Sequence, residues 1–324
     1  MAAVGTYPAR GPLRGLMALA LVAVTGLIGC DVALGPTVRD PELTRSVPPS
    51  EVPFRSLRSA ELQRHYERVQ ANLLAKGLMR TDGGGPDTPY DAATLAKNFE
   101  TIAFYDEYAR GAGLSTRGGK AGRLRRWEDP VRVTVGFGNS VPQDVRLRDR
   151  QMVASYTERL AGVTGHPIAM SPVRPNFHVL FMGEDDKDQL IDELRVLVPD
   201  VTEDTLDIFR DLPRSIYCLV VASSPTGRPN TYHKAIALVR AEHPDLVRLS
   251  CVHEEMAQGL GLANDDPRVR PSIFNDDDEF ALLTSHDEHL LRILYDPRLR
   301  PGMTLERARP VIQTIARELM GQNL

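Results

Sequence analysis

The sequence has little aromatic character and no excess of basic charge. One Trp occurs among 324 residues, and Phe, Trp and Tyr together make up 6% of the chain. Lys and Arg number 39 against 43 Asp and Glu, so the formal net charge is −4. Nucleic-acid binders usually carry a basic excess, and proteins that stack bases need aromatic platforms. The composition therefore argues against both classes and is typical of an ordinary globular protein.

Motifs that would indicate common enzyme classes are also missing. The sequence contains no Walker A motif and no G-x-S-x-G nucleophile elbow. Gly136 to Val141 begins like a dinucleotide fingerprint, but Val141 stands where the third Gly belongs, so the pattern predicts a strand end. Ser285, His286 and Asp287 are sequence neighbours that cannot align as a triad, and they predict the start of a helix.

Long apolar runs are scarce, and the longest lies near the N-terminus. Arg10 and Arg14 precede or flank an apolar segment, residues 16–28, that is too short to span a bilayer. It ends in Leu27-Ile28-Gly29-Cys30, which resembles a lipobox, so we expect a lipoprotein signal peptide and a lipid anchor on Cys30. The alternative is an ordinary signal peptide with a chance Cys. Asp31 favours the inner membrane, with the protein facing the periplasm.

Cysteine is rare, with three residues in the chain. Once Cys30 is lipidated, Cys218 and Cys251 remain, and such a pair in an oxidising periplasm usually forms a disulfide. On the chain-entropy model this bridge would contribute about 3 to 4 kcal/mol. The alternatives are two buried thiols or, less favoured, a catalytic Cys.

Composition and periodicity predict four segments along the chain. They are the signal peptide (1–29), a flexible tether (30–53), a helical N-terminal region (54–125) and the main domain (126–324). In the helical region, apolar residues at helical spacing predict one helix that ends near Gly77 and a second that reaches Tyr108. We expect these two helices to pack together and onto the main domain.

Strand-like and helix-like patterns alternate in the main domain. The predicted strands are 131–137, 167–170, 176–182, 215–223 and 232–239, and the predicted helices are 144–160, 186–197, 202–209 and 245–262. This order predicts a mixed sheet covered by helices, in an α/β (α+β) fold.

The stretch 251–266 carries the most informative pattern. It aligns with the zinc signature H-E-x-x-H-x-x-G-x-x-H. The three His positions of the signature are replaced, the first by Glu254, the second by Gln258 and the third by Asn264. The Glu and Gly positions are kept, as Glu255 and Gly261. The chain thus resembles metzincin (matrixin-like zincin) peptidases whose zinc site is degenerate. The resemblance implies a zincin-like mixed sheet, Glu255 at the general-base place and Phe274 at the place of the Met beneath the metal.

Other segments resemble a bacterial family. They are Glu-Glu-Met-Ala-Gln at 254–258, Leu-Gly-Leu at 260–262, Ser-Ile-Phe-Asn-Asp-Asp at 272–277 and Leu-Tyr-Asp-Pro-Arg-Leu-Arg-Pro-Gly-Met at 294–303. These segments resemble the DUF2927 family, whose function is unknown and whose members are often predicted to be secreted. The resemblance covers residues 126–303. It implies where the protein is located, outside the cytoplasm, and does not indicate a reaction.

The motif helix could place several oxygen ligands together. Residues four apart share a helix face, so Glu254 and Gln258 lie together, and a turn after the helix brings Asn264 and Asp265 back. Zinc favours imidazole and thiolate, whereas an oxygen-only set suits Ca²⁺, Mg²⁺ or Mn²⁺. Glu255 would be the base of any hydrolysis.

A second register of the motif begins at His253. It reads H-E-x-x-A, because Ala257 replaces the second ligand. His253 with a distant His233 or His286 could hold a metal, but the spacing does not require it. A polar residue flanking the site is the better interpretation.

Three interpretations of the motif helix stay open: a structural hydrogen-bond network, an inherited binding cleft, and an active enzyme with unusual ligands. We favour a membrane-anchored periplasmic lipoprotein that acts as a non-catalytic envelope binding or accessory protein. It would have an envelope protein or peptide partner, no nucleic acid and no cofactor. The alternative is a peptidase-like, metal-dependent hydrolase of envelope peptides. The acidic run 275–279 could hold calcium, but it lacks the Gly-containing EF-hand pattern, so we expect a solvated turn that caps the next helix.

Overall fold

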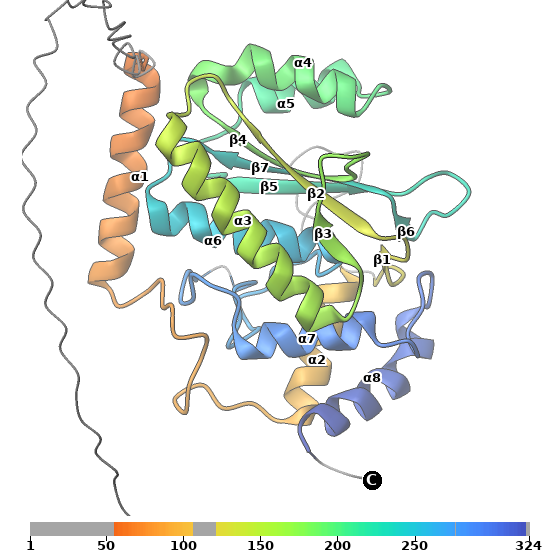
Figure 1. Ribbon diagram of the computed structural model, residues 1–324. Coiled ribbons are helices and arrows are strands. Elements are labelled where there is room, and N and C mark those ends of the chain that lie inside the picture. Colours follow the sequence, from red (N-terminus) through yellow and green to blue (C-terminus); the bar gives the residue numbers. More distant parts are fainter. Residues whose placement is uncertain (1–54, 106–120, 276, 322–324) are drawn as a thin grey trace, which may run out of the picture. The chain divides into compact units, whose positions relative to one another are not determined.

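The computed structural model describes residues 55–105, 121–275 and 277–321 (Figure 1). These residues belong to a single compact unit, 50–324. The expected signal peptide, the lipidated Cys30 and the tether lie outside the described residues.

A five-stranded mixed sheet forms the centre of this unit. Its strands are β2 (Val131–Phe137), β3 (Ile168–Met170), β4 (Phe177–Met182), β5 (Cys218–Ser223) and β7 (Lys234–Arg240). They lie in the order β3-β2-β4-β7-β5, and neighbours are parallel except for β5, which runs antiparallel to β7 at the edge. The predicted α/β class with a mixed sheet is therefore confirmed.

Helices cover both faces of the sheet, because alternate residues of each central strand point to opposite sides. Phe177, Val179 and Phe181 of β4 belong to the larger core cluster, whereas Leu180 and Met182 belong to a smaller one. The smaller cluster includes residues of α4 (Lys187–Leu197) and α5 (Glu203–Arg210). The larger one includes residues of α3 (Gln143–Thr164) and α6 (Asp245–Leu260), which cover the other face (Figure 1).

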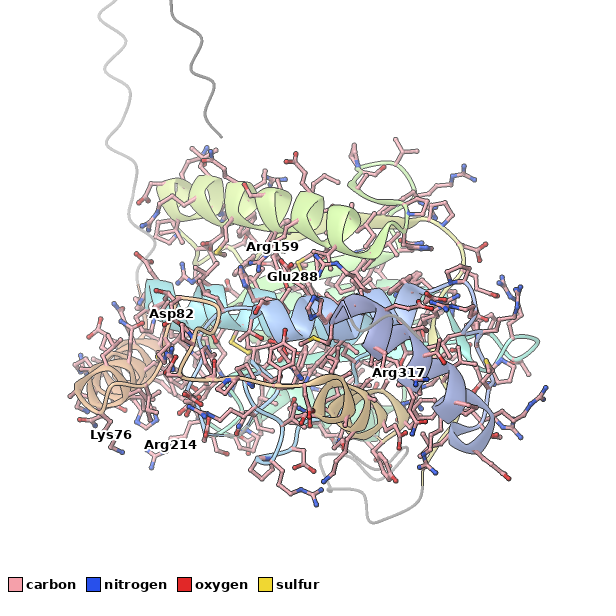
Figure 2. The ribbon with its side chains drawn as sticks, turned by 90° about the horizontal axis from the view of Figure 1, so that it is seen from below. Lys76, Asp82, Arg159, Arg214, Glu288 and Arg317 are labelled. Atoms are coloured by element: carbon pink, nitrogen blue, oxygen red, sulfur yellow. A yellow bond between two sulfur atoms is a disulfide. The ribbon has the colours of Figure 1, made fainter. Side chains whose placement is uncertain are left out.

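Three more helices extend the larger core. They are α2 (Ala92–Phe104), α7 (Ser285–Tyr295) and α8 (Leu305–Leu319). Their buried apolar residues, among them Phe99, Leu290 and Ile312, join the cluster that includes α3 and α6. An ion pair of 3.0 Å between Arg159 of α3 and Glu288 of α7 adds a polar link (Figure 2).

The first helix, α1 (Leu57–Ala75), lies apart from α2 (Figure 1). Its buried Tyr66 contacts the rings of Tyr217 and His243 edge-on. The prediction that the two N-terminal helices pack together is therefore wrong. Both helices contact the main domain, as predicted: α2 buries its apolar residues beside α7 and α8, whereas α1 buries Tyr66 and leaves Leu57 and Leu74 exposed.

Some elements differ from the sequence predictions. The second helix ends at Phe104 rather than Tyr108, and the motif helix ends at Leu260 rather than Leu262. A two-stranded parallel pair, β1 (Arg126–Trp127) with β6 (Thr231–Tyr232), a 3-10 turn (Glu184–Asp186) and α8 were not predicted. Two-residue strands carry no alternation that a sequence pattern could reveal. Among the described helices, none combines the length and apolar character that crossing a bilayer requires.

Candidate functional site

The motif lies on α6, which packs against β5 and β7. Pro244 precedes the helix with an extended backbone, and Asp245 stands in the first turn, where a carboxylate complements the helix dipole. The C-terminal half is almost wholly buried. Glu254, Glu255 and Gln258 therefore project from this helix, whereas Asn264 and Asp265 lie in the irregular segment that follows it.

A disulfide joins Cys251 of α6 to Cys218, the first residue of β5. The two Cα atoms are 5.8 Å apart. The predicted bridge is thus confirmed, and it ties the motif helix to the edge of the sheet. Neither sulfur can serve as a thiolate nucleophile or metal ligand while the bridge is intact.

Glu254 and Glu255 lie beside this bridge. One carboxylate oxygen of each, together with Cys218 Sγ, falls within 4.8 Å of the other two atoms. Within the described residues this is the one cluster of three His, Cys, Asp or Glu side chains with such spacing, and it does not include Asp265. Because Cys218 is bridged, only the two carboxylates of the cluster are available as ligands. Glu255 is 4% exposed, whereas Glu254 is half-buried. Without an imidazole or a free thiolate, this donor set does not suit zinc.

The other three predicted ligands make contacts of their own. The Gln258 amide nitrogen donates to both carboxylate oxygens of Asp265, at 2.9 and 3.1 Å. The Asn264 amide nitrogen donates to the backbone oxygen of Thr101 in α2, at 3.1 Å. Gln258 and Asp265 thus bond to each other across the turn, and Asn264 ties that turn to α2.

His253 is a packed core residue. Its Nδ1 accepts a hydrogen bond from the backbone N–H of Leu283 at 3.1 Å, and its ring stacks on Tyr156 at a centroid distance of 4.0 Å. Burial, with a smaller contribution from Arg159, lowers the pKa of His253 to about 3. The other two candidate histidines lie elsewhere: buried His286 contacts Asn98, and exposed His233 contacts the Ser223 backbone.

Gly261 ends the motif helix and makes the return turn possible. Its φ is +130°, and a Cβ at this position would lie 2.4 Å from the backbone oxygen of Arg125. The last carbonyls of α6 find side-chain donors: Trp127 Nε1 donates to Gly259 at 2.9 Å, and the Tyr295 hydroxyl donates to Leu260 at 3.0 Å. Only Gly satisfies both the backbone angle and the close approach.

The turn expected beneath the site is fixed by the buried carboxylate of Asp287, which the sequence predicted only as part of a helix start; that helix, α7, is confirmed. Asp287 of α7 accepts from Ser272 Oγ at 2.5 Å and from the backbone N–H of Ile273 at 3.0 Å. It also accepts from Thr284, which caps α7 in a reciprocal capping box. Phe274, the residue in the Met-turn place, is fully buried. The Thr-x-x-Asp spacing at the helix start is the signal that could have identified Asp287.

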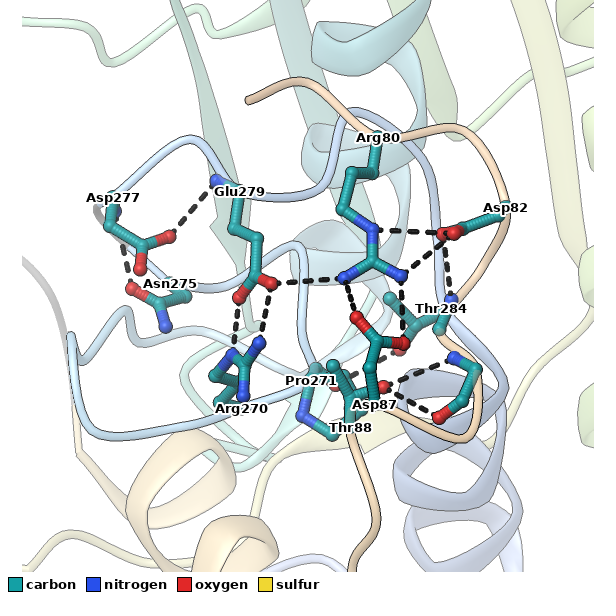
Figure 3. A network of polar contacts seen from close by, with 12 residues as sticks. Arg80, Asp82, Asp87, Thr88, Arg270, Pro271, Asn275, Asp277, Glu279 and Thr284 are labelled. Atoms are coloured by element: carbon teal, nitrogen blue, oxygen red, sulfur yellow. Dashed lines mark hydrogen bonds and ion pairs between the residues drawn. The ribbon is translucent and has the colours of Figure 1, made fainter. Parts of the chain in front are cut away.

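Glu279, the last residue of the acidic run, belongs to a network of ion pairs (Figure 3). Glu279 forms ion pairs with Arg270 and, at 3.2 Å, with Arg80, whose guanidinium also binds Asp82 and Asp87 at 2.7 Å each. These contacts with Arg80 and Arg270 lower the pKa values of the three carboxyl groups. The prediction that the run caps the next helix is wrong, because Thr284 and Asp287 cap α7.

The comparisons with known proteins give one result. The model of a family described as "Protein of unknown function (DUF2927)" matches residues 92–314. No curated protein matches the chain, and no solved structure does. The match is wider than the expected 126–303, because it starts at α2 and extends into α8. It spans well over half of the sequence, and the chain therefore belongs to the DUF2927 family.

Proposed function

We propose that this protein is an exported, lipid-anchored accessory protein that binds a partner in the bacterial cell envelope without hydrolysing it. The observation that carries the proposal is the pairing of Gln258 with Asp265. Four side chains would have to bind a catalytic metal. Two of them, Gln258 and Asp265, are hydrogen-bonded to each other, and a third, Asn264, bonds to α2 and holds the turn there. Such a network stabilises the end of the helix and leaves no strong ligand set that could acidify a water.

Descent from a zincin peptidase is part of the proposal. A mixed sheet with one antiparallel edge strand lies against the motif helix, and Gly261 turns the chain directly after it. Phe274 is buried in a turn that follows, as the resemblance to metzincins implies. On this reading the scaffold of the peptidase persists, and the residues that bound zinc now serve structure.

Metal content tests this proposal. We expect elemental mass spectrometry of the full chain, purified without chelator, to find no stoichiometric metal and peptide libraries to give no turnover. Gln258→Ala should lower the free energy of unfolding by about 1 to 3 kcal/mol, because it leaves the half-buried Asp265 carboxylate without this donor. A stoichiometric metal that disappears in both Glu254→Ala and Gln258→Ala would overturn the proposal.

The alternative, a metal-dependent hydrolase of envelope peptides, draws on the proximity of Glu254 and Glu255. Oxygen ligands of this kind suit a hard divalent cation, with Glu254, Gln258, Asn264 or Asp265 as ligands and Glu255 as base. If the hydrolase exists, Glu255→Gln will abolish turnover while the fold survives. Under the accessory proposal this variant behaves like the wild type in every hydrolysis assay.

The lipid anchor is tested separately. Cells fed an alkyne fatty acid should incorporate the label into the wild-type protein and not into Cys30→Ser. Equal labelling of both proteins would remove the anchor from the proposal, and it would leave the interpretation of the motif helix untouched.

A further inference from the structure

A basic groove lies between α1 and the segment 211–214, and none of its lining residues belongs to the motif helix. Its cavity volume is about 640 Å³. Its charged side chains are Arg58, Glu61, Arg64, Arg68, Glu184, Asp211, Arg214 and Arg240, with His65 among them. Five Arg residues therefore face three carboxylates, although the chain as a whole carries a net charge of −4.

Two of the three carboxylates, Glu184 and Asp211, lie close to Arg58. Glu184 lies 2.7 Å from Arg58 and 2.7 Å from Lys187, and Asp211 lies 3.7 Å from Arg58. Arg58 and Lys187 thus balance these two acids. The rest of the groove carries four Arg residues against Glu61 alone.

Arg240 supplies a fixed donor at the floor of the groove. It is 6% exposed, and its Nε and Nη2 donate to the backbone oxygens of Ile216, Leu212 and Pro213 at 2.7 to 2.9 Å. Its Nη1 has no hydrogen-bond partner among the described residues. This atom is also not fully buried. Nη1 is therefore open to the groove.

The walls bring three more guanidinium groups. Arg64 and Arg68 are four residues apart on α1 and so share a helix face. Arg214 stands across from them, at the periphery of the molecule beside α1 (Figure 2), and its backbone oxygen accepts from the Tyr66 hydroxyl at 3.1 Å. In the described part of the chain, none of these three side chains has an ion-pair or hydrogen-bond partner. Burial and then the charges of Arg214 and Arg68 lower the pKa of His65, which agrees with this crowding of cations.

We propose that this groove binds a phosphate-type anion, carried either by a free phosphorylated small molecule or by the headgroup of an anionic lipid. Guanidinium groups bind phosphate oxygens in a bidentate fashion, and several of them around one cavity favour a multiply charged anion. The walls are exposed and adaptable, whereas Arg240 is held by three carbonyls. The inference does not depend on the function proposed for the motif helix.

The test uses the full chain reconstituted into phosphatidylcholine vesicles, so that any anchor is the same in every sample. Isothermal titration calorimetry with pyrophosphate measures binding of a free anion. Hydrogen exchange of residues 57–75 and 211–216, compared between these vesicles and vesicles that also contain phosphatidylglycerol, measures binding of a headgroup. The variants are Arg68→Ala and Arg214→Ala, both exposed positions outside the core. Arg307→Ala removes the same charge from an exposed position of α8 and is the matched control.

We expect each groove variant to weaken pyrophosphate binding about tenfold or more, as the loss of a charge-assisted hydrogen bond implies, and Arg307→Ala to leave it unchanged. If phosphatidylglycerol protects the two segments from hydrogen exchange, the groove variants lose this protection, and pyrophosphate does not bind, the anion is a lipid headgroup. If pyrophosphate binds and phosphatidylglycerol gives no protection, the anion is a free phosphate. The proposal is overturned if neither probe is bound, or if Arg307→Ala weakens binding as much as the groove variants.

Discussion

At the scale of single residues, two histidines show how burial fixes a charge state. His253 and His243 are both buried, and burial lowers the pKa of each to about 3. The Leu283 backbone N–H donates to His253 Nδ1 and so requires a neutral ring there, whereas His243 donates to the Tyr217 backbone oxygen, a bond that raises its pKa but is outweighed by burial. Both rings therefore stay neutral in the folded protein at pH values where the unfolded chain is protonated.

This difference predicts acid sensitivity. Below about pH 6.5 the unfolded chain binds protons at these histidines and the folded chain does not, so stability is complete above pH 6.5 and falls toward pH 3. In His253→Asn the amide oxygen can still accept from Leu283. We expect the slope of unfolding free energy against pH, between about pH 6.5 and 5, to fall by up to ~1.4 kcal/mol per pH unit.

Denaturant titrations at a series of pH values measure this slope. His233→Asn, at an exposed position, is the control and should keep the wild-type slope. An unchanged slope in His253→Asn would mean that His253 is not held neutral. Lower stability of the variant at neutral pH is expected as well, because the ring no longer stacks on Tyr156.

The limits of sequence reasoning are also clearest at this scale. The pattern placed Gln258 and Asp265 near each other, and they are, but it assigned both as metal ligands. In the folded chain the nitrogen of Gln258 faces Asp265, so the amide acts as a donor. Spacing along a helix predicts which side chains share a face, and it carries no information about which atom of an amide points inward.

At the scale of elements, Gly261 determines where the motif helix ends. A side chain there would meet the Arg125 backbone oxygen at 2.4 Å, in a backbone conformation that favours Gly. We expect Gly261→Ala to lower the free energy of unfolding by about 2 kcal/mol or more. Gly162→Ala is the control: it lies within α3 with open space around it, so thermal unfolding should show an unchanged or slightly raised midpoint. Equal effects of the two substitutions would contradict this account.

Most elements of the main domain were predictable because their patterns are local. The strand predicted at 131–137 coincides with β2, and the other predicted strands of the sheet overlap β3, β4, β5 and β7. The packing of the helices against one another was not predictable, because it depends on tertiary contacts. The pairing of α2 with α7 and α8, in place of α1, depends on residues about 200 positions apart, such as Glu100 and Arg309, which form an ion pair of 2.9 Å. No periodicity within one helix indicates its partner.

At the scale of the whole molecule, the disulfide closes a loop that includes β5, β6, β7 and half of α6. Its two Cys residues are 33 positions apart, so the bridge should contribute about 3 to 4 kcal/mol to the free energy of unfolding. We expect Cys218→Ala/Cys251→Ala to lose this amount in urea titrations. A reductant should destabilise the wild type to the same extent and leave the double variant unaffected. If it destabilises both equally, the effect does not come from this bridge.

The position of the bridge has a second consequence, for solubility. β5 is the last strand of the sheet, and on its outer side it pairs with no other strand of the described residues. Its Val221 is 52% exposed. An open strand edge with apolar side chains is a template onto which another polypeptide can add. The disulfide anchors the first residue of β5 to α6, so it opposes the separation of β5 from β7. In a reducing compartment this restraint is lost, and we expect the chain to aggregate more readily.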